Sequence, residues 1–564
     1  MKIGDGKVAD IVTTLFEKEA ELRGKGHQLP ALVLLKKDGT KEKYSWEDYL
    51  YYHAFSAATA LQDLNLVNPL KTGEENFVAI VPVNLPESFF ALLGIIIAGG
   101  VPVPIHPMLL KEPDKVKAIL DHCQPKITLI SECLAGEYKK NGHTTITVEQ
   151  LLTLGKRVYK NKSVKRLYHN DKIRNPNRLL IMPYTSGTTG GPKGVMLSHE
   201  NILDRTKAVI KALQIGPEDR VLSYLTLGHI SELVASFFGQ LVGGYTIYFT
   251  DYSTDREKLK ENFTSVLKRV RPTAFLGVPK VWINIETGVK EKIKLAGKLA
   301  GLTPICFIKN KIRQELGLDH TRVAISAGSE ISRHEINFFR KLGLNIVDIY
   351  GQTETAGPLL LNGSVIGNTN QVSLDPFNQE VLVAGKAVML GYYKNPEANE
   401  KHFEEKIYQT HPPTGEPLRE RLYHTGDTGR FNFSNKTISV TGRMGEGYKT
   451  AQGEYITEES IQRLEQEVKD QIRDIDPQAE VVIYGKGKPY QVALIFLNNR
   501  PSDKKELAKL HETLKTKTGA IGKGLLKIGS IAILNSQTDL ILTPTLKPRK
   551  KEILERFQKL IDEL

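Results

Sequence analysis

The sequence predicts an α/β protein with a large N-terminal domain of parallel sheets with helices plus a small β-barrel-like part, and a small α+β C-terminal domain. Three observations support this fold class. Short apolar segments alternate with helical patterns over most of the chain. Short strand patterns separated by turns begin near residue 377. A more highly charged segment with its own pattern of helices and strands follows residue 441.

Helices and strands alternate through the first 350 residues. Residues 45–64 predict a helix, because Leu50, Ala54, Ala57 and Leu61 lie on one side of it. The other elements expected here are helices at 86–98 and 115–123 and strands at 76–81, 101–105, 126–130, 221–227, 245–249, 274–278, 322–327 and 345–350. Short apolar strands that alternate with helices indicate parallel sheets covered on both faces.

The longest apolar stretch, residues 89–105, is interrupted by Gly99, Gly100 and two prolines. A membrane-spanning helix needs about 20 predominantly apolar residues. We therefore interpret this stretch as a buried helix, a glycine stop and a buried strand.

The C-terminal part of the chain predicts a separate small domain. Short strands are expected at 380–384, 429–433 and 437–440. After them come a helix at 457–470, strands at 480–484 and 491–497, a helix at 502–518 and a strand at 528–534. The predicted domains are therefore residues 1–440 and residues 441–564, with the boundary near 441–445.

The composition is that of an ordinary globular protein, with 40% hydrophobic and 25% charged residues. The three cysteines, Cys123, Cys133 and Cys306, have no metal-ligand spacing and are expected to be reduced. Residues 1–6 are polar and no apolar segment typical of a signal peptide follows them. The sequence therefore predicts a cytoplasmic protein.

The formal net charge of +13 favours anionic partners, such as nucleotides, CoA, anionic lipid or nucleic acid. The densest basic run, residues 155–178, is either a solvated loop or a contact with an anionic membrane surface. The second reading places the protein peripherally on the inner membrane surface. The run has few aromatic residues and no nucleic-acid-binding motif lies near it, so no nucleic-acid partner is expected. The predicted N-terminal helix, residues 8–20, either packs on its own domain or lies in a membrane interface.

A loop rich in glycine and hydroxyl groups follows the predicted strand at 179–182. Residues 184–194 read YTSGTTGGPKG. Glycines let backbone N–H groups face a bound anion, and hydroxyls and a lysine add donors and positive charge. The residues expected to bind phosphate are Thr185, Ser186, Gly187, Thr188, Thr189 and Lys193.

Three other interpretations of this loop fit the sequence less well. A flexible linker rarely carries Pro-Lys-Gly followed by an apolar segment. A Walker A loop needs Gly-Lys-Ser/Thr, whereas Pro192 precedes Lys193 here and Gly194 follows it. A protein-kinase loop would be accompanied by HRD and DFG motifs, which the chain lacks.

The segment TSGTTGGPKG resembles the signature of the acyl-adenylate-forming superfamily, which includes acyl-CoA synthetases and peptide-synthetase adenylation domains. The resemblance extends from about residue 45 to residue 564. It implies that ATP activates a carboxylic acid and that the small C-terminal domain is mobile. It gives Thr185 a catalytic as well as a nucleotide-binding role.

Two further motifs follow in the order that this superfamily has. Residues 350–354 read YGQTE, and the resemblance implies that Glu354 is a catalytic residue that ligates Mg²⁺. It also places Tyr350, Gly351 and Thr353 against the nucleotide. Residues 325–331 read ISAGSEI and resemble a turn beside adenine, so the resemblance assigns nucleotide contacts to Gly328, Ser329 and Glu330.

The C-terminal motifs complete the implied nucleotide and CoA sites. By resemblance, Asp427 in YHTGDTGR and Arg443 in GRMGEGYK contact the ribose. Gly445 occupies the position of the interdomain hinge. The resemblance also implies that Gly453 and Glu454 line the channel for CoA. Lys547 in TPTLKPR would be the catalytic lysine that reaches the α-phosphate and the carboxylate.

Two segments point toward a fatty acyl substrate. Residues 223–232, SYLTLGHISE, are similar to a segment of long-chain enzymes that places His229 near the acyl carboxylate, as a catalytic residue. Residues 271–285, RPTAFLGVPKVWINI, are similar to a second such segment, although Trp282 also fits simple core packing. The chain departs from the pattern of the long-chain enzymes at Gln352 and in being shorter after residue 285.

These observations favour a long-chain fatty acid–CoA ligase that uses ATP, Mg²⁺ and CoA. The alternatives are a fatty acyl-AMP ligase that loads a carrier protein and an aryl or short-chain acyl-CoA ligase. A catalytically inactive nucleotide-binding regulator is an alternative outside the enzymes.

Overall fold

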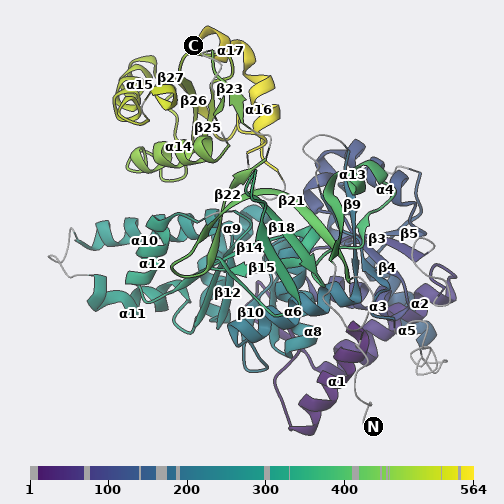
Figure 1. Cartoon of the computed structure of the whole chain (residues 1–564). Coiled ribbons are helices and arrows are strands. Elements are labelled where there is room, and N and C mark those ends of the chain that lie inside the picture. The colour runs from purple at the N-terminus through teal and green to yellow at the C-terminus, as the bar shows by residue number, and fades with distance from the viewer. Residues whose placement is uncertain are drawn as a thin grey trace. The chain divides into compact units, whose positions relative to one another are not determined.

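The computed structural model describes residues 10–68, 76–138, 142–159, 175–185, 191–297, 305–329, 331–408, 418–444, 447–451, 455–456, 458–522, 524–543 and 548–564. The chain forms two compact units (Figure 1). The first unit consists of Met1–Leu276, Thr303–Val372 and Val383–His424. The second consists of Gly277–Leu302, Ser373–Leu382 and Thr425–Leu564. The domain boundary near 441 stays a prediction.

A parallel sheet in the first unit confirms the predicted alternation of strands and helices. Its order is β4-β3-β5-β6, and all neighbouring strands are parallel. The strands are β3 (Phe77–Val81), β4 (Val101–Pro104), β5 (Ile127–Ile130) and β6 (Thr145–Thr147). Every residue of β3, β4 and β5 is buried, so both faces of the sheet are covered at its centre.

The apolar stretch 89–105 forms the predicted helix, stop and strand. Helix α3 (Pro86–Ile97) begins with proline in its first turn and ends before Gly99, whose φ is +88°. Strand β4 follows directly. All residues of α3 except Glu87 are buried, so this is a core helix.

Two other sheets mix parallel and antiparallel pairs. In the sheet of order β10-β11-β1-β2, β11 is parallel to β10 and β1, whereas β2 is antiparallel to β1. Its strands are β1 (Leu32–Leu35), β2 (Lys41–Tyr44), β10 (Arg220–Leu222) and β11 (Thr246–Thr250). The sheet of order β12-β13-β14-β15-β16 has a parallel β13–β14 pair and antiparallel pairs beyond it. Its strands are β12 (Ala274–Gly277), β13 (Val323–Ala327), β14 (Ile346–Gln352), β15 (Gly357–Leu361) and β16 (Ser364–Val365).

A small antiparallel sheet adjoins the predicted phosphate loop. Of its strands, the sequence predicts only the first, at 179–182. Strand β9 (Lys193–Ser198) pairs with β7 (Leu179–Ile181), β8 (Tyr184–Thr185) and β19 (Gly391–Tyr392). This pairing brings the loop together with a segment of the chain that is distant in sequence.

Helices surround these sheets in the first unit (Figure 1). They are α1 (Ile11–Gly24), α2 (Phe55–Asp63), α4 (Pro113–Cys123), α5 (Val148–Tyr159), α6 (His199–Leu213), α7 (Ile230–Glu232), α8 (Gly239–Gly243), α9 (Arg256–Val270), α11 (Ile305–Leu316), α12 (Arg333–Lys341) and α13 (Pro396–His402). The helix predicted at 45–64 begins as a π-helical segment, η1 (Asp48–Ala54), before it continues as α2.

A further sheet occupies the region where the sequence predicts the β-barrel-like part. Its order is β17-β18-β21-β20, and β22 also pairs with β21. The strands are β17 (Asn370–Leu374), β18 (Glu380–Gly385), β20 (Phe403–Tyr408), β21 (Leu418–Asn432) and β22 (Thr437–Arg443). The prediction of a short strand at 429–433 is wrong about its length. β21 begins at Leu418, and the charged residues in its first half, RER, hide the strand pattern in the sequence.

The C-terminal part of the second unit has the predicted order of elements. Strands β25 (Glu480–Tyr484), β26 (Gln491–Leu497) and β27 (Ile528–Asn535) form a three-stranded sheet. β25 and β26 are antiparallel, and β26 and β27 are parallel. The other elements of this unit are α10 (Pro279–Gly297), β23 (Tyr448–Lys449), β24 (Tyr455–Ile456), α14 (Glu458–Gln471), α15 (Lys504–Gly519), α16 (Lys550–Arg556) and α17 (Gln558–Glu563). β26 is buried along its whole length, between two clusters of buried apolar side chains.

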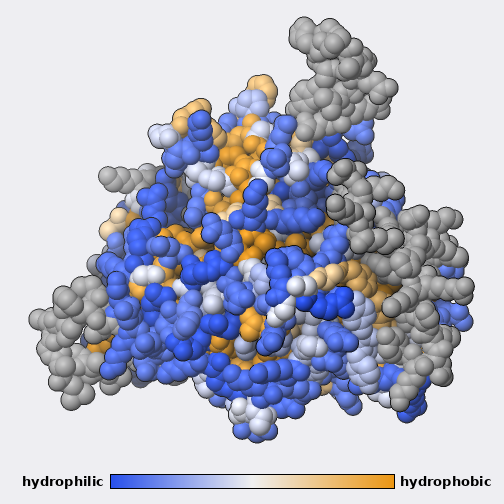
Figure 2. Space-filling model, turned by 90° about the horizontal axis from the view of Figure 1, so that it is seen from below, coloured by the Kyte–Doolittle hydropathy of each residue, from blue (hydrophilic) through white to orange (hydrophobic). Residues whose placement is uncertain are grey.

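The N-terminal helix packs on its own unit. Ile11, Val12, Leu15 and Leu22 of α1 are buried, and α1 contacts α8. These contacts favour the packing interpretation over the membrane-interface interpretation. Among the described residues, no helix is long and apolar enough to span a membrane. On the face in Figure 2, hydrophilic residues cover most of the surface and hydrophobic residues show between them.

Candidate active site

The phosphate loop is held at both of its ends by one antiparallel pair of strands. Tyr184 is the partner of Gly194, and Thr185 is the partner of Lys193. Both Thr185 and Lys193 are partly exposed at the end of this pair. Ser186, Gly187, Thr188 and Thr189 lie outside the described residues. The structure therefore places two of the predicted phosphate-binding residues side by side at the base of the loop.

Lys193 faces an aromatic ring that the sequence analysis did not single out. Its Nζ lies 5.0 Å from the centre of the Tyr392 ring. In the part of the chain that the structure describes, Lys193 has no ion-pair partner. Its positive charge is therefore not neutralised by a neighbouring carboxylate, which suits an anionic ligand.

Glu354 lies in a short turn after β14. This turn is the 3₁₀ segment η8 (Thr353–Thr355), which ends at Ala356 in the left-handed region with φ +53°. The Tyr392 hydroxyl donates to Glu354 Oε1 at 3.0 Å. The N–H of Met389 donates to the Glu354 carbonyl oxygen at 2.9 Å. Both the carboxylate and the backbone of Glu354 are therefore held by the segment around β19.

The other residues of the YGQTE motif shape this turn. A Cβ on Gly351 would lie 2.1 Å from the Gly357 carbonyl oxygen, so the close approach of β14 and β15 requires glycine there. Thr353 is buried, and Tyr350 is partly exposed. Gln352, where the chain departs from the long-chain pattern, accepts a hydrogen bond from the Tyr423 hydroxyl on Oε1 at 3.0 Å.

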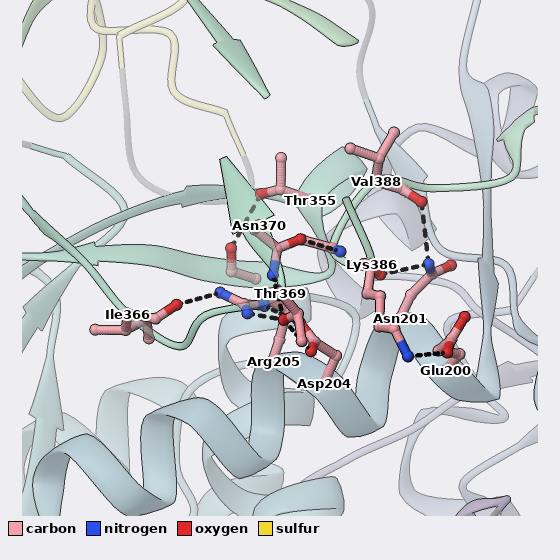
Figure 3. Close-up of polar contacts among 12 residues, drawn as sticks. Glu200, Asn201, Asp204, Arg205, Thr355, Ile366, Thr369, Asn370, Lys386 and Val388 are labelled. Carbon is pink, nitrogen blue, oxygen red and sulfur yellow. Dashed lines mark hydrogen bonds and ion pairs between the residues drawn. The ribbon is translucent and has the colours of Figure 1, made fainter. Parts of the chain in front are cut away.

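A polar network ties helix α6, which directly follows β9, to the segment before β19 (Figure 3). Asn201 on α6 donates from Nδ2 to the carbonyl oxygens of Lys386, at 2.8 Å, and Val388, at 3.0 Å. The network thus fixes the chain just before Met389, whose N–H holds the backbone of Glu354.

A buried arginine anchors the same helix one turn later (Figure 3). The side chain of Arg205 is fully buried and donates to the Ile366 carbonyl oxygen at 3.1 Å. It also forms an ion pair with Asp204, and Asn370 donates to the same carboxylate at 2.8 Å. Because each charge in this group has a partner, we interpret it as a structural anchor.

The turn predicted beside adenine follows β13. Gly328 has φ +94°, a conformation that glycine adopts without a steric penalty. Ser329 is exposed at this turn, and Glu330 lies outside the described residues. The structure thus confirms a turn at Gly328 but does not test the assigned nucleotide contacts.

In the second unit, Asp427 and Arg443 face each other on neighbouring strands. They are register partners of β21 and β22, and Arg443 Nε donates to Asp427 Oδ1 at 3.0 Å. The side chain of Asp427 is 7% exposed, whereas that of Arg443 is 51% exposed. The structure therefore brings the two predicted ribose-binding residues together. Gly445, Gly453, Glu454 and Lys547 lie outside the described residues.

The segment 223–232 contains a buried carboxyl group that the sequence analysis missed. Glu232 accepts hydrogen bonds from the hydroxyls of Ser223 and Ser236, both at 2.7 Å. Asn84 donates to the same oxygen at 3.4 Å and to the Leu225 carbonyl oxygen at 2.6 Å. Burial raises the pKa of Glu232 to about 7, although the hydrogen bonds from the two serines oppose the rise. The carboxyl group therefore fixes both ends of the segment that carries His229.

His229 is partly exposed and lies next to a second histidine. The rings of His106 and His229 meet edge to face, with centroids 6.2 Å apart. Nδ1 of His106 accepts from the Met108 N–H at 3.0 Å, so a neutral ring carries its proton on Nε2. Burial and the nearby positive charges lower the pKa of His106 to about 3, so this ring is neutral at physiological pH.

Trp282 is fully buried, and a Cβ on Gly277 would lie 2.8 Å from its Nε1. This close packing supports the core-packing interpretation of Trp282. The residues missed by sequence reasoning are Asn84, His106, Arg205, Glu232, Tyr392 and Tyr423. Two of them lie in segments that the sequence had marked: Glu232 in SYLTLGHISE and Tyr423 at the start of YHTGDTGR.

Comparison with known proteins gives matches along most of the chain. Residues 19–393 match a family described as AMP-binding enzyme. The long-chain-fatty-acid–CoA ligase ACSBG2 of Gallus gallus is 26% identical over 490 residues, which cover 75% of this chain and 60% of that protein. ACSBG2 of Rattus norvegicus is 26% identical over 467 residues, which cover 71% of this chain and 66% of that protein. The matched part thus spans less than two thirds of each of these two relatives.

A solved structure shares the fold. The adenylation domain of a carboxylate reductase from Mycobacterium chelonae superimposes with a TM-score of 0.71 at 18% sequence identity. The superposition covers 99% of this chain and 91% of that domain. This similarity confirms the predicted fold class, an α/β architecture with a small C-terminal part.

Proposed function

Because this chain belongs to the AMP-binding enzyme family, we propose that it activates a long-chain fatty acid with ATP and transfers the acyl group to CoA. The names of the matched relatives support the long-chain substrate and the CoA acceptor. The observation in the structure that carries the proposal is the group formed by Lys193, Tyr392 and Glu354. It offers one positive charge and one carboxylate next to a loop suited to phosphate.

Lys193 and the base of the loop are assigned to the phosphates of ATP. Lys193, at the end of the β8–β9 pair, lies at the base of the glycine-rich loop. In phosphoryl and nucleotidyl transfer the protein contributes mainly by positioning groups and neutralising charge on phosphate oxygens. Thr185 adds a hydroxyl donor at the same place. Thr353 and Tyr350 are assigned to the α-phosphate and the adenine.

The residues around Glu354 fit a magnesium ion. Mg²⁺ is usually held by one or two carboxylates together with substrate phosphates and waters. Glu354 is partly exposed and is kept in place by Tyr392, so it supplies one such carboxylate. When bound, Mg²⁺ would neutralise charge on the phosphate oxygens.

Asp427 and Arg443 are assigned to the ribose. A carboxylate accepts hydrogen bonds from both ribose hydroxyls, and the hydrogen bond from the adjacent guanidinium orients Asp427. His229 is assigned to the carboxylate of the acid. Its segment is held rigidly by Glu232 and Asn84, which suits a residue that positions a substrate.

The proposed reaction has two halves. In the first, a carboxylate oxygen of the acid attacks the α-phosphorus, pyrophosphate leaves and an acyl-adenylate forms. In the second, the thiolate of CoA attacks the acyl carbonyl carbon and AMP leaves. Lys547 is assigned to the first half, and Gly453 and Glu454 to the CoA channel of the second. A mobile C-terminal domain, with a hinge at Gly445, would let one site serve both halves.

A substrate panel tests this function. The full chain is incubated with Mg·ATP and one acid at a time, with and without CoA, and pyrophosphate release and thioester are measured. We expect palmitate to give both products. No thioester with any fatty acid and CoA would refute the ligase. Thioester formed only on a phosphopantetheinyl carrier protein would identify the acyl-AMP ligase. Turnover confined to aryl or short-chain acids would identify the aryl or short-chain acyl-CoA ligase.

A lysine variant separates an enzyme from an inactive nucleotide-binding regulator. Lys547→Ala is expected to abolish pyrophosphate release while ATP still binds. Lys551→Ala is the matched control, because Lys551 is exposed on α16. Unchanged turnover in Lys547→Ala would show that the role given to Lys547 is wrong, and no turnover in the unaltered chain would favour the regulator.

We also propose peripheral contact with an anionic membrane, motivated by the net charge of +13 and an insoluble substrate. Most of the basic run 155–178 lies outside the described residues. The test is cosedimentation with vesicles of anionic or neutral lipid at low and high salt. Binding to anionic vesicles that salt reverses is expected, and no binding at low salt would refute it.

A further inference from the structure

We propose that Tyr392 is a positioning residue of the ATP site, which holds Lys193 and Glu354 at a fixed separation and keeps them available for phosphate and magnesium. This inference rests on the proposed function. The contacts of its ring, its hydroxyl and its backbone carry this inference, and all of them lie within the first unit.

The ring and the hydroxyl of Tyr392 serve different partners. The ring lies 5.0 Å from Lys193 Nζ, within the range of a cation–π contact. The hydroxyl donates to Glu354 Oε1 at 3.0 Å. A neutral side chain that contacts a cation through its ring and a carboxylate through its hydroxyl orients both groups without cancelling either charge.

The backbone of Tyr392 is held in two ways. As part of β19, it is the antiparallel register partner of Val195 in β9, the strand that begins at Lys193. The side-chain amide of Asn399 accepts from the Tyr392 N–H at 2.7 Å and donates to its carbonyl oxygen at 3.0 Å. Tyr392 is therefore registered against the same strand that carries Lys193.

Packing fixes the ring of Tyr392 as well. The side chain is 3% exposed, and the ring meets that of His402 edge to face with centroids 5.7 Å apart. His402 is itself placed by a 3.0 Å contact of Nδ1 with the His424 carbonyl oxygen. A buried tyrosine normally gives its hydroxyl a partner, and here the partner is the carboxylate assigned to magnesium.

Two substitutions separate the contacts. Tyr392→Phe removes the hydroxyl and keeps the ring, and Tyr392→Leu removes both. Tyr245→Phe is the matched control, because the buried Tyr245 donates its hydroxyl to the Ala235 carbonyl oxygen, away from these residues. If Tyr392→Phe fails to fold, Asn399→Ala replaces it, since this change removes the clamp on the Tyr392 backbone.

Two measurements are made on the full chain. The first is Mn²⁺ binding, by electron paramagnetic resonance, in the presence of a non-hydrolysable ATP analogue. The second is the Mg²⁺ concentration that gives half of the maximal rate of pyrophosphate release. A hydrogen bond to a charged group is worth about a tenfold change. We therefore expect Tyr392→Phe to weaken Mn²⁺ binding about tenfold and to raise the half-maximal Mg²⁺ concentration about tenfold. Metal-free binding of the analogue should stay within about twofold.

Tyr392→Leu is expected to weaken metal-free binding of the analogue as well, by about threefold, because the cation–π contact is lost. Asn399→Ala should act in the same direction as Tyr392→Phe. If Tyr392→Phe matches Tyr245→Phe in both metal measurements, the inference is overturned. If the unaltered chain neither binds the analogue nor releases pyrophosphate, it is the proposed function that fails.

Discussion

The buried carboxyl group of Glu232 makes a sharp prediction about how stability depends on pH. Glu232 is 1% exposed, and burial raises its pKa from 4.5 to about 7. The folded state binds the Glu232 proton more tightly than the unfolded chain does. The resulting contribution to the free energy of unfolding is therefore complete below pH 4.5 and is lost as the pH rises toward 7. At about 1.4 kcal/mol for each factor of ten, the loss amounts to about 3 kcal/mol.

Glu232→Gln isolates this contribution. The amide cannot ionise, so the variant does not lose this part of its free energy of unfolding between pH 4.5 and 7. Any destabilisation that the amide itself causes at this site is the same at every pH. We expect the free energy of unfolding of the wild type, minus that of the variant, to fall by about 3 kcal/mol across this interval. The contributions of the other titrating groups to the free energy of unfolding are the same in both proteins and cancel in this difference. Urea denaturation at closely spaced pH values from 4 to 9 measures it.

Ser236→Ala provides the matched test. The Ser236 hydroxyl donates to Glu232 and favours its charged form, so its removal is expected to raise the pKa further. The loss of stability should then extend above pH 7. A difference between the wild type and Glu232→Gln that stays constant from pH 4.5 to 8 would refute the reasoning, because it would mean that Glu232 titrates alike in both states.

Three other substitutions test the fold and the site. Arg205→Met should destabilise the first unit by about 3 kcal/mol in urea denaturation, because it removes the cationic partner of the largely buried Asp204 carboxylate. Gly351→Ala should also destabilise it, by about 2 kcal/mol or more, since the new Cβ would meet the Gly357 carbonyl oxygen. Asp427→Asn should weaken ATP binding about tenfold by fluorescence anisotropy, through loss of charge-assisted hydrogen bonds. 2′,3′-Dideoxy-ATP should bind the wild type and this variant alike, and a tenfold difference with that nucleotide would contradict the ribose assignment.

The sequence predicted the central elements well because their burial is regular. β25 and β26 have the predicted bounds, and β26 is buried throughout, so its apolar run marks its whole length. The prediction was weakest where polar residues occupy strands or where strands end in side-chain hydrogen bonds. The strand predicted at 221–227 ends at Leu222, because the following residues, from Ser223, bond to Glu232 and Asn84.

The candidate site was predictable only where its residues form contiguous motifs. Lys193 lies in a loop whose composition indicates phosphate binding, and Glu354 and Asp427 lie in short motifs whose roles the resemblance to the acyl-adenylate-forming superfamily implies. Tyr392 does not, because its role depends on the pairing of β19 with β9, which are far apart in the sequence. β19 has only two residues, too few for an alternating pattern, so a single sequence does not reveal this pairing.

The way in which cations are neutralised separates structural from ligand-binding roles. Arg205 is fully buried and bonded to Asp204, and Lys550 in the second unit contacts the carboxylates of Glu458 and Glu465. Such cations are paired because an unpaired buried charge is strongly unfavourable. Lys193 differs: in the described part of the chain it faces the neutral ring of Tyr392 and has no carboxylate partner. The same side chain also binds Glu354, which a direct ion pair with Lys193 would neutralise. A cation and a carboxylate held on one tyrosine fit the magnesium-bound polyphosphate that we propose for this site.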